Sequence, residues 1–475
     1  MSQYSQLFKA YDIRGTSPQI NEKVYYFSGF SFVEQILKVE KLPLTVIVAR
    51  DYRLTSPKFY NALIQGIIDA GAEVIGIGHC TTDTLYAATL LFKCSGCMVT
   101  ASHNPRDDNG IKIVKKVPQM LGLESGLDKV RDVVLSVIDE TVLPQISESK
   151  VHELARNKVI EFFVSKIREI GDSSDINEML AWQGRKLKIA VDCGNGMGGF
   201  IMPYIQKLYT NIEFIPLFWD LDGNFPNHPA DPQNINNLVD LKKVVLDQKC
   251  DFGIAFDGDG DRAFFVDENG EPLPGDFLVA LFAETLLKDK KQGKYPEFNN
   301  AVVYCQPGSR LAIDVITEND GVAIPSKQGH TYIKSEVDKY KAIYGGEFSG
   351  HHYFGQFGSM DSGAIAVSLM IKIYVTQNKK FSDLFARYAD EYFVSDLMNL
   401  KIPQGQTFGD VKAKIEEYFH DARISEMDGV SVFYPEWKFS MRPSNTEPLI
   451  RFILETTGVD SVQEKIELVR RIGGV

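Results

Sequence analysis

Short apolar runs of strand length recur along the chain, and segments with helical spacing of apolar residues lie between them. The first three runs are TVIVARD (45–51), AEVIGIG (72–78) and CMVTAS (97–102). They are rich in β-branched residues, as expected of buried strands. Residues 56–71 place apolar side chains at helical spacing, which predicts an amphipathic helix. Strands that alternate with helices predict mostly parallel sheets covered by helices.

The same layout recurs twice more along the chain. The later runs lie at 187–193, 212–218 and 252–257, and then at 301–306, 321–326 and 341–347. From about Asp396 the pattern changes to a strand, a helix and two strands with period-two alternation. We therefore predict an α/β fold, with three similar mixed or parallel-sheet α/β domains and a smaller C-terminal α+β domain around one central cleft.

Polar, glycine-rich loops follow the third run of each segment. The loops are TASHNPRDDNG, DGDGDR and GGEFSGHHYFG, and MRPSNTEP plays this part in the last segment. Ligands of open α/β sheets gather at the carboxyl ends of strands, so these loops are expected to converge on one cleft. The predicted domains, each with one such loop, are 1–150, 151–270, 271–392 and 393–475.

Composition and charge narrow the possible functions. The 475 residues are too many for one core of ordinary size, and 44% hydrophobic with 24% charged residues is a globular composition. The net charge of −12 argues against non-specific binding to nucleic acid or anionic membranes. We expect neither a signal peptide nor a membrane-spanning stretch. Six cysteines in this length do not make a disulfide scaffold, so we expect a cytoplasmic protein.

Three carboxylates alternate with glycines in FDGDGDR, at Asp257, Asp259 and Asp261. Charges this close repel one another unless a cation neutralises them. The glycines allow the loop to curl, which brings the carboxylates together. Oxygen-only ligands select Mg²⁺ or Ca²⁺ over softer metals. The loop is therefore a candidate magnesium site.

Two other interpretations of this loop stay open at the level of sequence. An EF-hand would fit the acidic positions as far as Glu268, but it needs glycine where Arg262 stands and a helix where AFFVD follows. A haloacid-dehalogenase-type phosphotransferase would use Asp257 as its nucleophile, although Asp261 takes the place of its usual Thr or Val. A non-catalytic protein that binds Ca²⁺ or sugar is a third possibility.

Ser102 lies at the junction after the third run and has a possible partner in the acidic loop. A divalent cation there can contact a phosphate on Ser102, because a phosphoserine carries about −1.5 to −2 charges. Arg262, next to the acidic loop, can hold phosphate or sugar oxygens. Lys112 follows Asn109–Gly110, a tight-turn signal that would fold Lys112 back toward Ser102.

The remaining loops carry donors and acceptors suited to a phosphorylated sugar. Glu347 and Ser349 suit sugar hydroxyls, and His351 suits proton transfer near neutral pH. His330 stands beside Gly329 in KQGHTYIK. Donors fit for a phosphate dianion cluster in RPSNTEP, at Arg442, Ser444, Asn445 and Thr446.

Taken together, these loops resemble the α-D-phosphohexomutase superfamily. FKAYDIRG resembles the opening motif of that family, TASHNP its phosphoserine loop and DGDGDR its magnesium loop. GEFSGH resembles its sugar loop and RPSNTEP its phosphate loop. All five motifs occur in the family's order and cover most of the chain. The ordered set is far more specific than any one motif.

The resemblance implies an enzyme that interconverts 1-phospho and 6-phospho sugars through phosphorylated Ser102 and a hexose 1,6-bisphosphate, which also serves as activator. Mg²⁺ would lie on Asp257, Asp259, Asp261 and the Ser102 phosphate. Ser102, Arg14, Lys112 and His351 would be catalytic. The implied substrate-binding residues are Tyr11, His103, Arg262, Gly329, His330, Glu347, Ser349, Arg442, Ser444, Asn445 and Thr446.

Within this superfamily, GEFSGHHYF and the following DSGAIA look most like bacterial phosphomannomutases, including those that accept glucose phosphates. The phosphoglucosamine mutase branch shares GExSGH and stays an alternative. One departure concerns the substrate: Gln306 stands where dual-specificity members often carry Lys. The expected partner is a small phosphosugar, with neither nucleic acid nor membrane, and the expected assembly is a monomer or homodimer.

Overall fold

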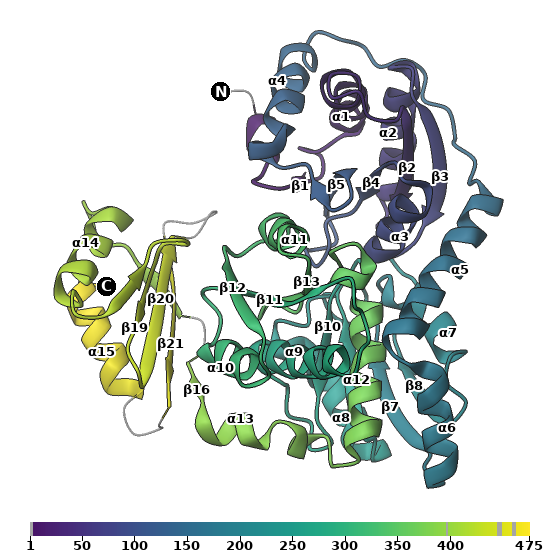
Figure 1. Cartoon of the computed structure of the whole chain (residues 1–475). Helices are drawn as coiled ribbons and strands as arrows, with labels where there is room; N and C mark the ends of the chain where they lie inside the picture. The colour runs from purple at the N-terminus through teal and green to yellow at the C-terminus, as the bar shows by residue number, and fades with distance from the viewer. Residues whose placement is uncertain (1–2, 396–397, 444–448, 458–461) are drawn as a thin grey trace. The chain divides into compact units, whose positions relative to one another are not determined.

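The computed structural model describes residues 3–395, 398–443, 449–457 and 462–475. The chain, coloured by residue number in Figure 1, divides into two compact units. The first comprises Met1–Leu273 with Ser349–Phe381, and the second comprises Pro274–Phe348 with Ser382–Val475. No helix in these described ranges is long and apolar enough to cross a membrane.

The first unit opens with a mixed sheet in the order β1-β5-β4-β2-β3, with β6 beside β5. Strand β2 is parallel to both β3 and β4, whereas β5 is antiparallel to β1 and β4. Its strands are β1 (Ile13–Thr16), β2 (Thr45–Arg50), β3 (Glu73–His79), β4 (Ser95–Val99), β5 (Asp108–Lys116) and β6 (Gln119–Met120). The helices are α1 (Glu22–Phe32), α2 (Ser56–Asp69), α3 (Thr82–Phe92) and α4 (Leu127–Val137), with short helical turns η1 (Ser5–Leu7), η2 (Val33–Leu37) and η3 (Leu123–Ser125).

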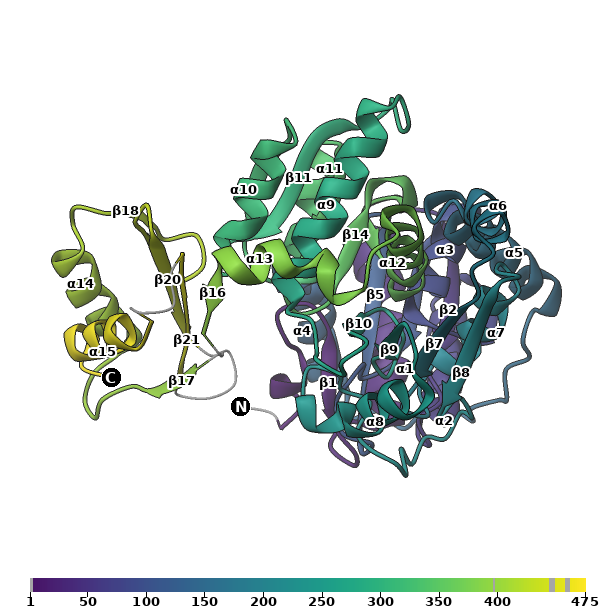
Figure 2. The same cartoon turned by 90° about the horizontal axis from the view of Figure 1, so that it is seen from below.

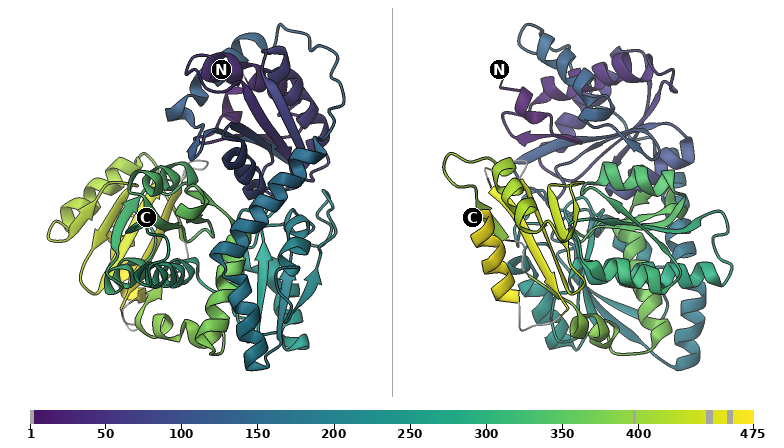
Figure 3. Two further views of the ribbon diagram at one scale, coloured as in Figure 1. Left: turned by 45° about the vertical axis from the view of Figure 1, so that its right-hand side comes forward. Right: turned by 60° about the vertical axis from the view of Figure 1, so that its left-hand side comes forward.

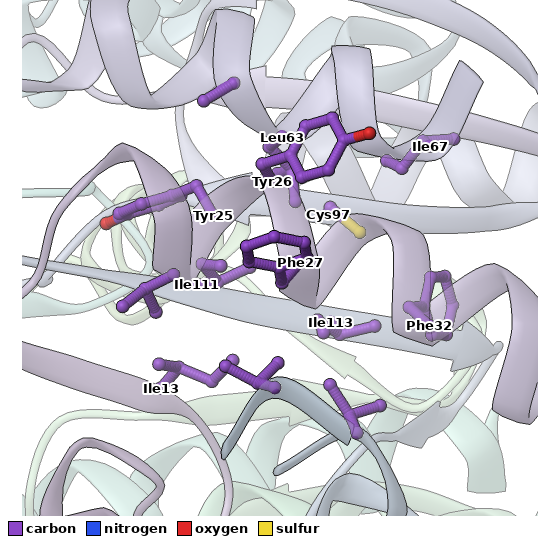
Figure 4. Packing of buried hydrophobic residues seen from close by; sticks show 14 of the residues in the cluster. Ile13, Tyr25, Tyr26, Phe27, Phe32, Leu63, Ile67, Cys97, Ile111 and Ile113 are labelled. Carbon is purple, nitrogen blue, oxygen red and sulfur yellow. The ribbon is translucent and has the colours of Figure 1, made fainter. Parts of the chain in front are cut away.

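The core of this first sheet explains why these segments take these forms. Helix α2 lies where the sequence predicts a helix, with Pro57 in its first turn and buried residues at helical spacing. Figure 4 shows Tyr25 and Phe27 of α1 near Ile111 of β5, with Leu63 of α2 close by. The burial of this apolar surface is the main favourable contribution to folding.

One sequence prediction is wrong in this sheet. Asn109 and Gly110 form no tight turn but lie inside β5, where Gly110 pairs with Arg14 of β1. The Asn109 side chain is fully buried, and its amide donates to Thr55 Oγ1 (2.8 Å) and Ser56 Oγ (3.0 Å). These buried hydrogen bonds and the pairing with β1 outweigh the preference of the Asn-Gly dipeptide for a turn. The chain reverses earlier, between β4 and β5.

The second sheet of this unit has the order β10-β9-β7-β8. Strand β7 is parallel to both β8 and β9, as predicted. Its elements are β7 (Leu187–Asp192), α7 (Gly198–Gln206), β8 (Ile212–Leu217), η4 (Ile235–Leu238), α8 (Val239–Gln248), β9 (Phe252–Phe256) and β10 (Ala263–Val266). Strands β9 and β10 form an antiparallel hairpin around the acidic loop. A strand therefore leaves the loop where an EF-hand needs a helix, which excludes that interpretation.

Helices and one further segment complete the first unit. Helices α5 (Glu153–Ile170) and α6 (Ser173–Gln183) precede the second sheet. The segment from residue 349 adds β14 (His352–Phe354), η5 (Gly355–Phe357), β15 (Met360–Asp361) and α12 (Gly363–Gln377). Helix α12 packs beside α5, as the green and teal-blue helices of Figure 3 show. Residues 349–381, from the later part of the third α/β domain, thus belong to the first unit.

The second unit contains a parallel three-stranded part, β12-β11-β13, and the C-terminal domain. Its first elements are α9 (Gly275–Lys291), β11 (Asn299–Cys305), α10 (Arg310–Glu318), β12 (Val322–Ser326), α11 (His330–Lys339) and β13 (Ala342–Gly346). Then follow η6 (Ser382–Leu384), α13 (Ala386–Glu391) and β16 (Phe393–Val394).

The C-terminal domain is a sheet in the order β16-β21-β20-β19-β18, with β17 paired to β21. Its remaining elements are β17 (Met398–Lys401), α14 (Phe408–Tyr418), β18 (Arg423–Ser425), β19 (Val430–Phe433), β20 (Trp437–Pro443), β21 (Leu449–Thr456) and α15 (Val462–Gly473). Figure 2 shows both helices on one face of this sheet, where Ile415 and Val469 contribute to a core with Phe439. The fold is thus three α/β domains and a smaller α+β domain, as predicted.

Candidate active site

Ser102 lies in the loop between β4 and β5, and its side chain faces the acidic loop. The residue is 4% exposed and has the left-handed φ of +53°, which is uncommon for a residue other than glycine. Ser102 Oγ donates to Asp257 Oδ2 at 2.9 Å and lies 3.3 Å from His103 Nδ1. A Cβ at Gly258 would lie 2.3 Å from the Ser102 carbonyl oxygen, so glycine is required for this approach.

Arg53 binds the backbone of the Ser102 loop, a role that the sequence did not reveal. Its guanidinium is 1% exposed, pairs with Asp51 Oδ2 (3.1 Å) and lies over the ring of Phe225. It donates to four backbone carbonyl oxygens of the loop, those of Ser102 (2.7 Å), Asn104 (2.7 Å), Pro105 (2.6 Å) and Asp108 (3.0 Å). The planar fork of donors makes arginine suited to such a cluster of acceptors.

The acidic loop wraps around the carboxylate of Asp257. Asp257 Oδ1 accepts from the amides of Gly260 (3.1 Å) and Arg262 (3.2 Å). Asp257 Oδ2 accepts from Arg262 Nε at 2.9 Å as well as from Ser102. The loop curls as predicted, and the carboxylate oxygens of Asp257, Asp259 and Asp261 lie within 4.8 Å of one another.

Lys112 reaches this loop from β5 rather than lying beside Ser102 through a turn. Its ammonium is buried and donates to Asp259 Oδ2 (2.7 Å) and to Asp261 Oδ2 (2.6 Å). The side chain therefore bridges two of the three carboxylates. The charge of Lys112 is thus buried and paired.

The free oxygens of this cluster fit a hard divalent cation. Among the residues that the structure describes, Asp259 Oδ1 and Asp261 Oδ1 are buried and accept no hydrogen bond. Buried carboxylate oxygens that accept no hydrogen bond are unfavourable, and a cation would satisfy them. The donors are all oxygen, the ligand type that Mg²⁺ and Ca²⁺ prefer. The cluster is therefore chemically suited to Mg²⁺.

The ionisable groups of this cluster have pKa values shifted in different directions. Burial raises the pKa of Asp257 to about 7, with the neighbouring carboxylates adding to the rise and Arg262 opposing it. Burial also opposes ionisation of Asp259, but the charge and hydrogen bond of Lys112, with the hydrogen bond from Thr82, hold its pKa well below the usual range. Against its own burial, the pKa of Lys112 is raised by these carboxylates. Lys112 is thus a charged ammonium.

His351 and Ser349 stand at the edge of the same cluster. His351 Nε2 lies 3.8 Å from Asp261 Oδ1, and Ser349 Oγ lies 3.2 Å from His351 Nδ1. Asp361, from β15, joins Asp261 and His351 in a second group of close ligand atoms. The sequence prediction named His351 and Ser349 but not Asp361.

Arg14 and His103 lie on the Ser102 side of the first domain. Arg14 donates to Asn104 Oδ1 (2.8 Å) of the Ser102 loop and pairs with Asp12 (2.6 Å). Burial, with the charges of Arg262 and Arg14, lowers the pKa of His103 well below its ordinary value. Its ring is therefore neutral. Tyr11 is half-buried, next to Asp12 in the chain.

The other predicted substrate-binding residues belong to the second unit. Glu347 is buried, and its Oε1 accepts from the amide of Gly329 at 2.8 Å, so GEFSGH and KQGHTYIK contact each other. His330 begins helix α11. Arg442 is half-buried on β20. Ser444, Asn445 and Thr446 lie outside the described residues.

Comparison with known proteins places this geometry in a family. Four family models, all described as phosphoglucomutase/phosphomannomutase, match successive parts of the chain. They are alpha/beta/alpha domains I, II and III over residues 5–133, 162–270 and 274–392, and the C-terminal domain over residues 397–471. The chain belongs to the phosphoglucomutase/phosphomannomutase family.

Whole-chain relatives support the same family. A phosphomannomutase of Vibrio cholerae is 32% identical over 477 residues, which are 98% of each chain. A phosphomannomutase/phosphoglucomutase of Pseudomonas syringae is 33% identical over 457 residues, 95% of this chain and 91% of the relative. A crystal structure of a phosphoglucomutase/phosphomannomutase family protein from Burkholderia thailandensis superposes with a TM-score of 0.81 at 26% identity, over 100% of this chain and 98% of that one. The protein is an enzyme of the phosphohexomutase class.

This phosphohexomutase also has supporting residues that sequence motifs did not indicate. Arg53 and Thr82 contact the Ser102 loop and the acidic loop from positions 49 and 177 residues away in the sequence. Near Thr82 the sequence carries a local signal, because the preceding residue, Thr81, caps helix α3 by accepting a hydrogen bond from the amide of Thr84. Such a cap predicts where a helix begins and gives no hint of a contact with Asp259.

Proposed function

We propose that the enzyme interconverts mannose 6-phosphate and mannose 1-phosphate, with the glucose phosphates as candidate second substrates. The names of the full-length relatives support mannose and glucose phosphates as the substrate class. The observation that carries the proposal is the Ser102 hydroxyl, which is held in a left-handed loop residue and directed at Asp257 of an acidic loop. A phosphate on that oxygen would lie against oxygen ligands suited to Mg²⁺.

In the proposed reaction, Ser102 carries a phosphoryl group and transfers it to the free hydroxyl of the phosphosugar. The bond between phosphorus and Ser102 Oγ breaks, and a bond from phosphorus to the sugar oxygen forms. The sugar hydroxyl loses a proton and Ser102 Oγ gains one. The hexose 1,6-bisphosphate then turns over and returns its other phosphate to Ser102, so the serine ester is regenerated. The same bisphosphate added from outside would act as activator by phosphorylating Ser102.

We assign the cation to Asp257, Asp259, Asp261 and the Ser102 phosphate. The buried free oxygens of Asp259 and Asp261 support this assignment. When bound, Mg²⁺ would neutralise charge on the transferring phosphoryl group. Arg262 lies within reach of the same place, because its guanidinium is already bonded to Asp257 beside Ser102.

The remaining roles follow the groups that each side chain offers. Arg14, Lys112 and His351 would manage protons and charge around the transfer. The residues that would contact the substrate are Tyr11, His103, Arg262, Gly329, His330, Glu347 and Ser349. The phosphate that is not reacting would be held by Arg442, Ser444, Asn445 and Thr446. This one phosphate-binding site would then bind either phosphate of the hexose 1,6-bisphosphate, which is why the sugar must turn over between the two transfers.

The test compares wild type, Ser102→Ala and Asp257→Asn in coupled assays that start from mannose 1-phosphate, glucose 1-phosphate and glucosamine 1-phosphate. We expect Ser102→Ala to abolish turnover and phosphoenzyme formation, and Asp257→Asn to weaken turnover while phosphate still forms on Ser102. If Asp257→Asn abolished the phosphoenzyme and Ser102→Ala kept it, Asp257 would be the nucleophile, as in the dehalogenase-type alternative. Preference for glucosamine phosphates over mannose phosphates would favour the phosphoglucosamine mutase alternative.

Compartment, assembly and domain limits stay proposals of the same kind. All six cysteines carry free thiols, which supports the cytoplasm as the compartment. We keep the monomer or homodimer as the expected assembly. We also keep 1–150, 151–270, 271–392 and 393–475 as the domain boundaries.

A further inference from the structure

The first turn of helix α3 contacts the acidic loop through both backbone and side chain. The amide of Thr82 donates to the carbonyl oxygen of Asp259 at 3.0 Å. The hydroxyl of Thr82 donates to the Asp259 carboxylate, at Oδ2, at 2.6 Å. Thr82 is fully buried, so these bonds form away from competing water. One residue of the first domain thus binds the same residue of the second domain twice.

These bonds determine which oxygen of Asp259 is free. Asp259 Oδ2 accepts from Thr82 and from Lys112, whose ammonium lies 2.7 Å away. The other oxygen, Oδ1, is buried and accepts no hydrogen bond from the described part of the chain. The carboxylate cannot rotate without breaking both bonds to Oδ2. Thr82 and Lys112 together therefore present Oδ1 to the place proposed for the cation.

Asp83 ties the same turn to the start of helix α12. Its carboxylate accepts from the hydroxyls of Thr81 and Ser362, the latter at 2.7 Å, and from the amide of Ala364 at 3.4 Å. Helix α12 in turn packs against the acidic loop, since a Cβ at Gly363 would lie 2.8 Å from the Gly260 carbonyl oxygen. The acidic loop is thus held between the first turns of two helices, and Asp83 joins those turns.

We propose that Thr82 is a positioning residue for the divalent-cation site, because it orients the Asp259 carboxylate so that Oδ1 is available as a ligand. The inference rests on the cation site of the proposed function. Groups that orient a metal ligand from outside the coordination sphere typically change metal affinity or activity by about 10- to 100-fold when removed. Loss of the Thr82 hydroxyl should therefore weaken the cation more than it weakens the fold.

A matched control separates this role from the general effect of deleting a buried hydroxyl. Thr89 lies on the same helix and is likewise buried, but its hydroxyl donates to the Tyr86 carbonyl oxygen rather than to a residue of the acidic loop. The variants are Thr82→Val, Thr82→Ser and Thr89→Val. Valine replaces the hydroxyl by a methyl group of similar size, whereas serine keeps the hydroxyl. Thr82→Ala replaces Thr82→Val if the valine variant does not fold.

The experiment measures the Kd of Mn²⁺, as a probe of the cation site, by electron paramagnetic resonance on the full chain. Phosphate on Ser102 is matched between samples by mass spectrometry, because it would add a ligand. We expect Thr82→Val to raise the Kd about 10- to 100-fold, and Thr82→Ser and Thr89→Val to stay near wild type. Thermal unfolding should show similar stability losses for the two valine variants.

Two results would overturn the inference in distinguishable ways. An unchanged Kd in Thr82→Val, or an equal rise in Thr89→Val, would show that Thr82 does not position the ligand, while the cation site itself would stand. A wild-type chain that binds no Mn²⁺ would overturn the cation site of the proposed function and this inference with it.

Discussion

Arg53 Nη2 donates to the carbonyl oxygen of Ser102 at 2.7 Å, so a buried guanidinium holds the backbone of the proposed nucleophile. The same group binds three further carbonyls of the loop, and Arg53 follows the end of β2 by three residues. The left-handed φ of Ser102 needs such support, because it is intrinsically unfavourable for serine. The position of the Ser102 hydroxyl therefore depends on a residue that takes no part in the chemistry.

We expect Arg53→Lys to lower kcat by about 100-fold, because a small misplacement of a reacting group has effects of that size. Lysine keeps the charge but cannot bind four carbonyls from one plane. Stability should fall by roughly 2–4 kcal/mol, since buried acceptors lose charged donors. Arg50→Lys is the control, because Arg50 makes one bond to the backbone, at the Asp51 carbonyl oxygen. Equal kcat in the two variants would contradict the role of Arg53.

Mg²⁺ should stabilise the folded protein through the oxygens of Asp259 and Asp261 that accept no hydrogen bond. A ligand that binds only the folded state adds about 2.7 kcal/mol when its concentration is roughly 100 times its Kd. Thermal unfolding with increasing Mg²⁺ should therefore show a rising Tm. Chelation should remove both the shift and the activity, and Mg²⁺ should restore them. A Tm that does not depend on Mg²⁺ in the wild type would speak against the site.

Lys112→Met should make the protein depend more strongly on Mg²⁺ for stability. Removing one partner of a buried ion pair destabilises by about 3–5 kcal/mol, and here two carboxylates lose the same ammonium. A cation neutralises the same carboxylates, so the rise in Tm with Mg²⁺ should exceed that of the wild type. Lys115→Met, on the same strand with its surface partner Glu40, is the control and should change little. An equal Mg²⁺ effect in both variants would refute the shared role.

The pH dependence of stability should include a contribution from His79. Burial, with the charges of Arg156 and Arg50, lowers the pKa of His79 from 6.5 to about 4. Between these values the unfolded chain binds a proton that the folded chain does not, so this contribution is complete above pH 6.5 and is lost as the pH falls toward 4.

The variant His79→Gln isolates that contribution. Urea unfolding on both sides of the ordinary histidine pKa, about 6.5, gives the stability difference between wild type and variant. We expect the free energy of unfolding of the wild type, relative to that of His79→Gln, to fall as the pH is lowered. A difference that stays constant with pH would show that His79 titrates normally in the folded protein.

The sequence predicted the parts of this protein whose evidence is local. The strand runs and the helix over 56–71 were confirmed, because β-branched runs and helical spacing reflect burial directly. The curled acidic loop was also confirmed. Asn109 was misjudged, because its buried partners lie more than 50 residues away in the sequence and outweigh a dipeptide preference.

Support for the site could not be predicted in the same way. Arg53 and Thr82 act through contacts with the Ser102 loop and with Asp259 that no local pattern encodes. Lys112 was expected to fold back toward Ser102 through a turn, whereas its strand carries it to Asp259 and Asp261. A motif identifies the residues that carry the chemistry, whereas the residues that hold them follow from the fold.

The central claim is that the Ser102 hydroxyl carries the phosphoryl group. The most direct test is peptide mass spectrometry of the protein, as purified and after incubation with glucose 1,6-bisphosphate and Mg²⁺. We expect one phosphoryl group on Ser102, gained or increased on incubation and absent from Ser102→Ala. An unmodified Ser102 under both conditions would contradict the mechanism, and phosphate on Asp257 instead would identify a different nucleophile.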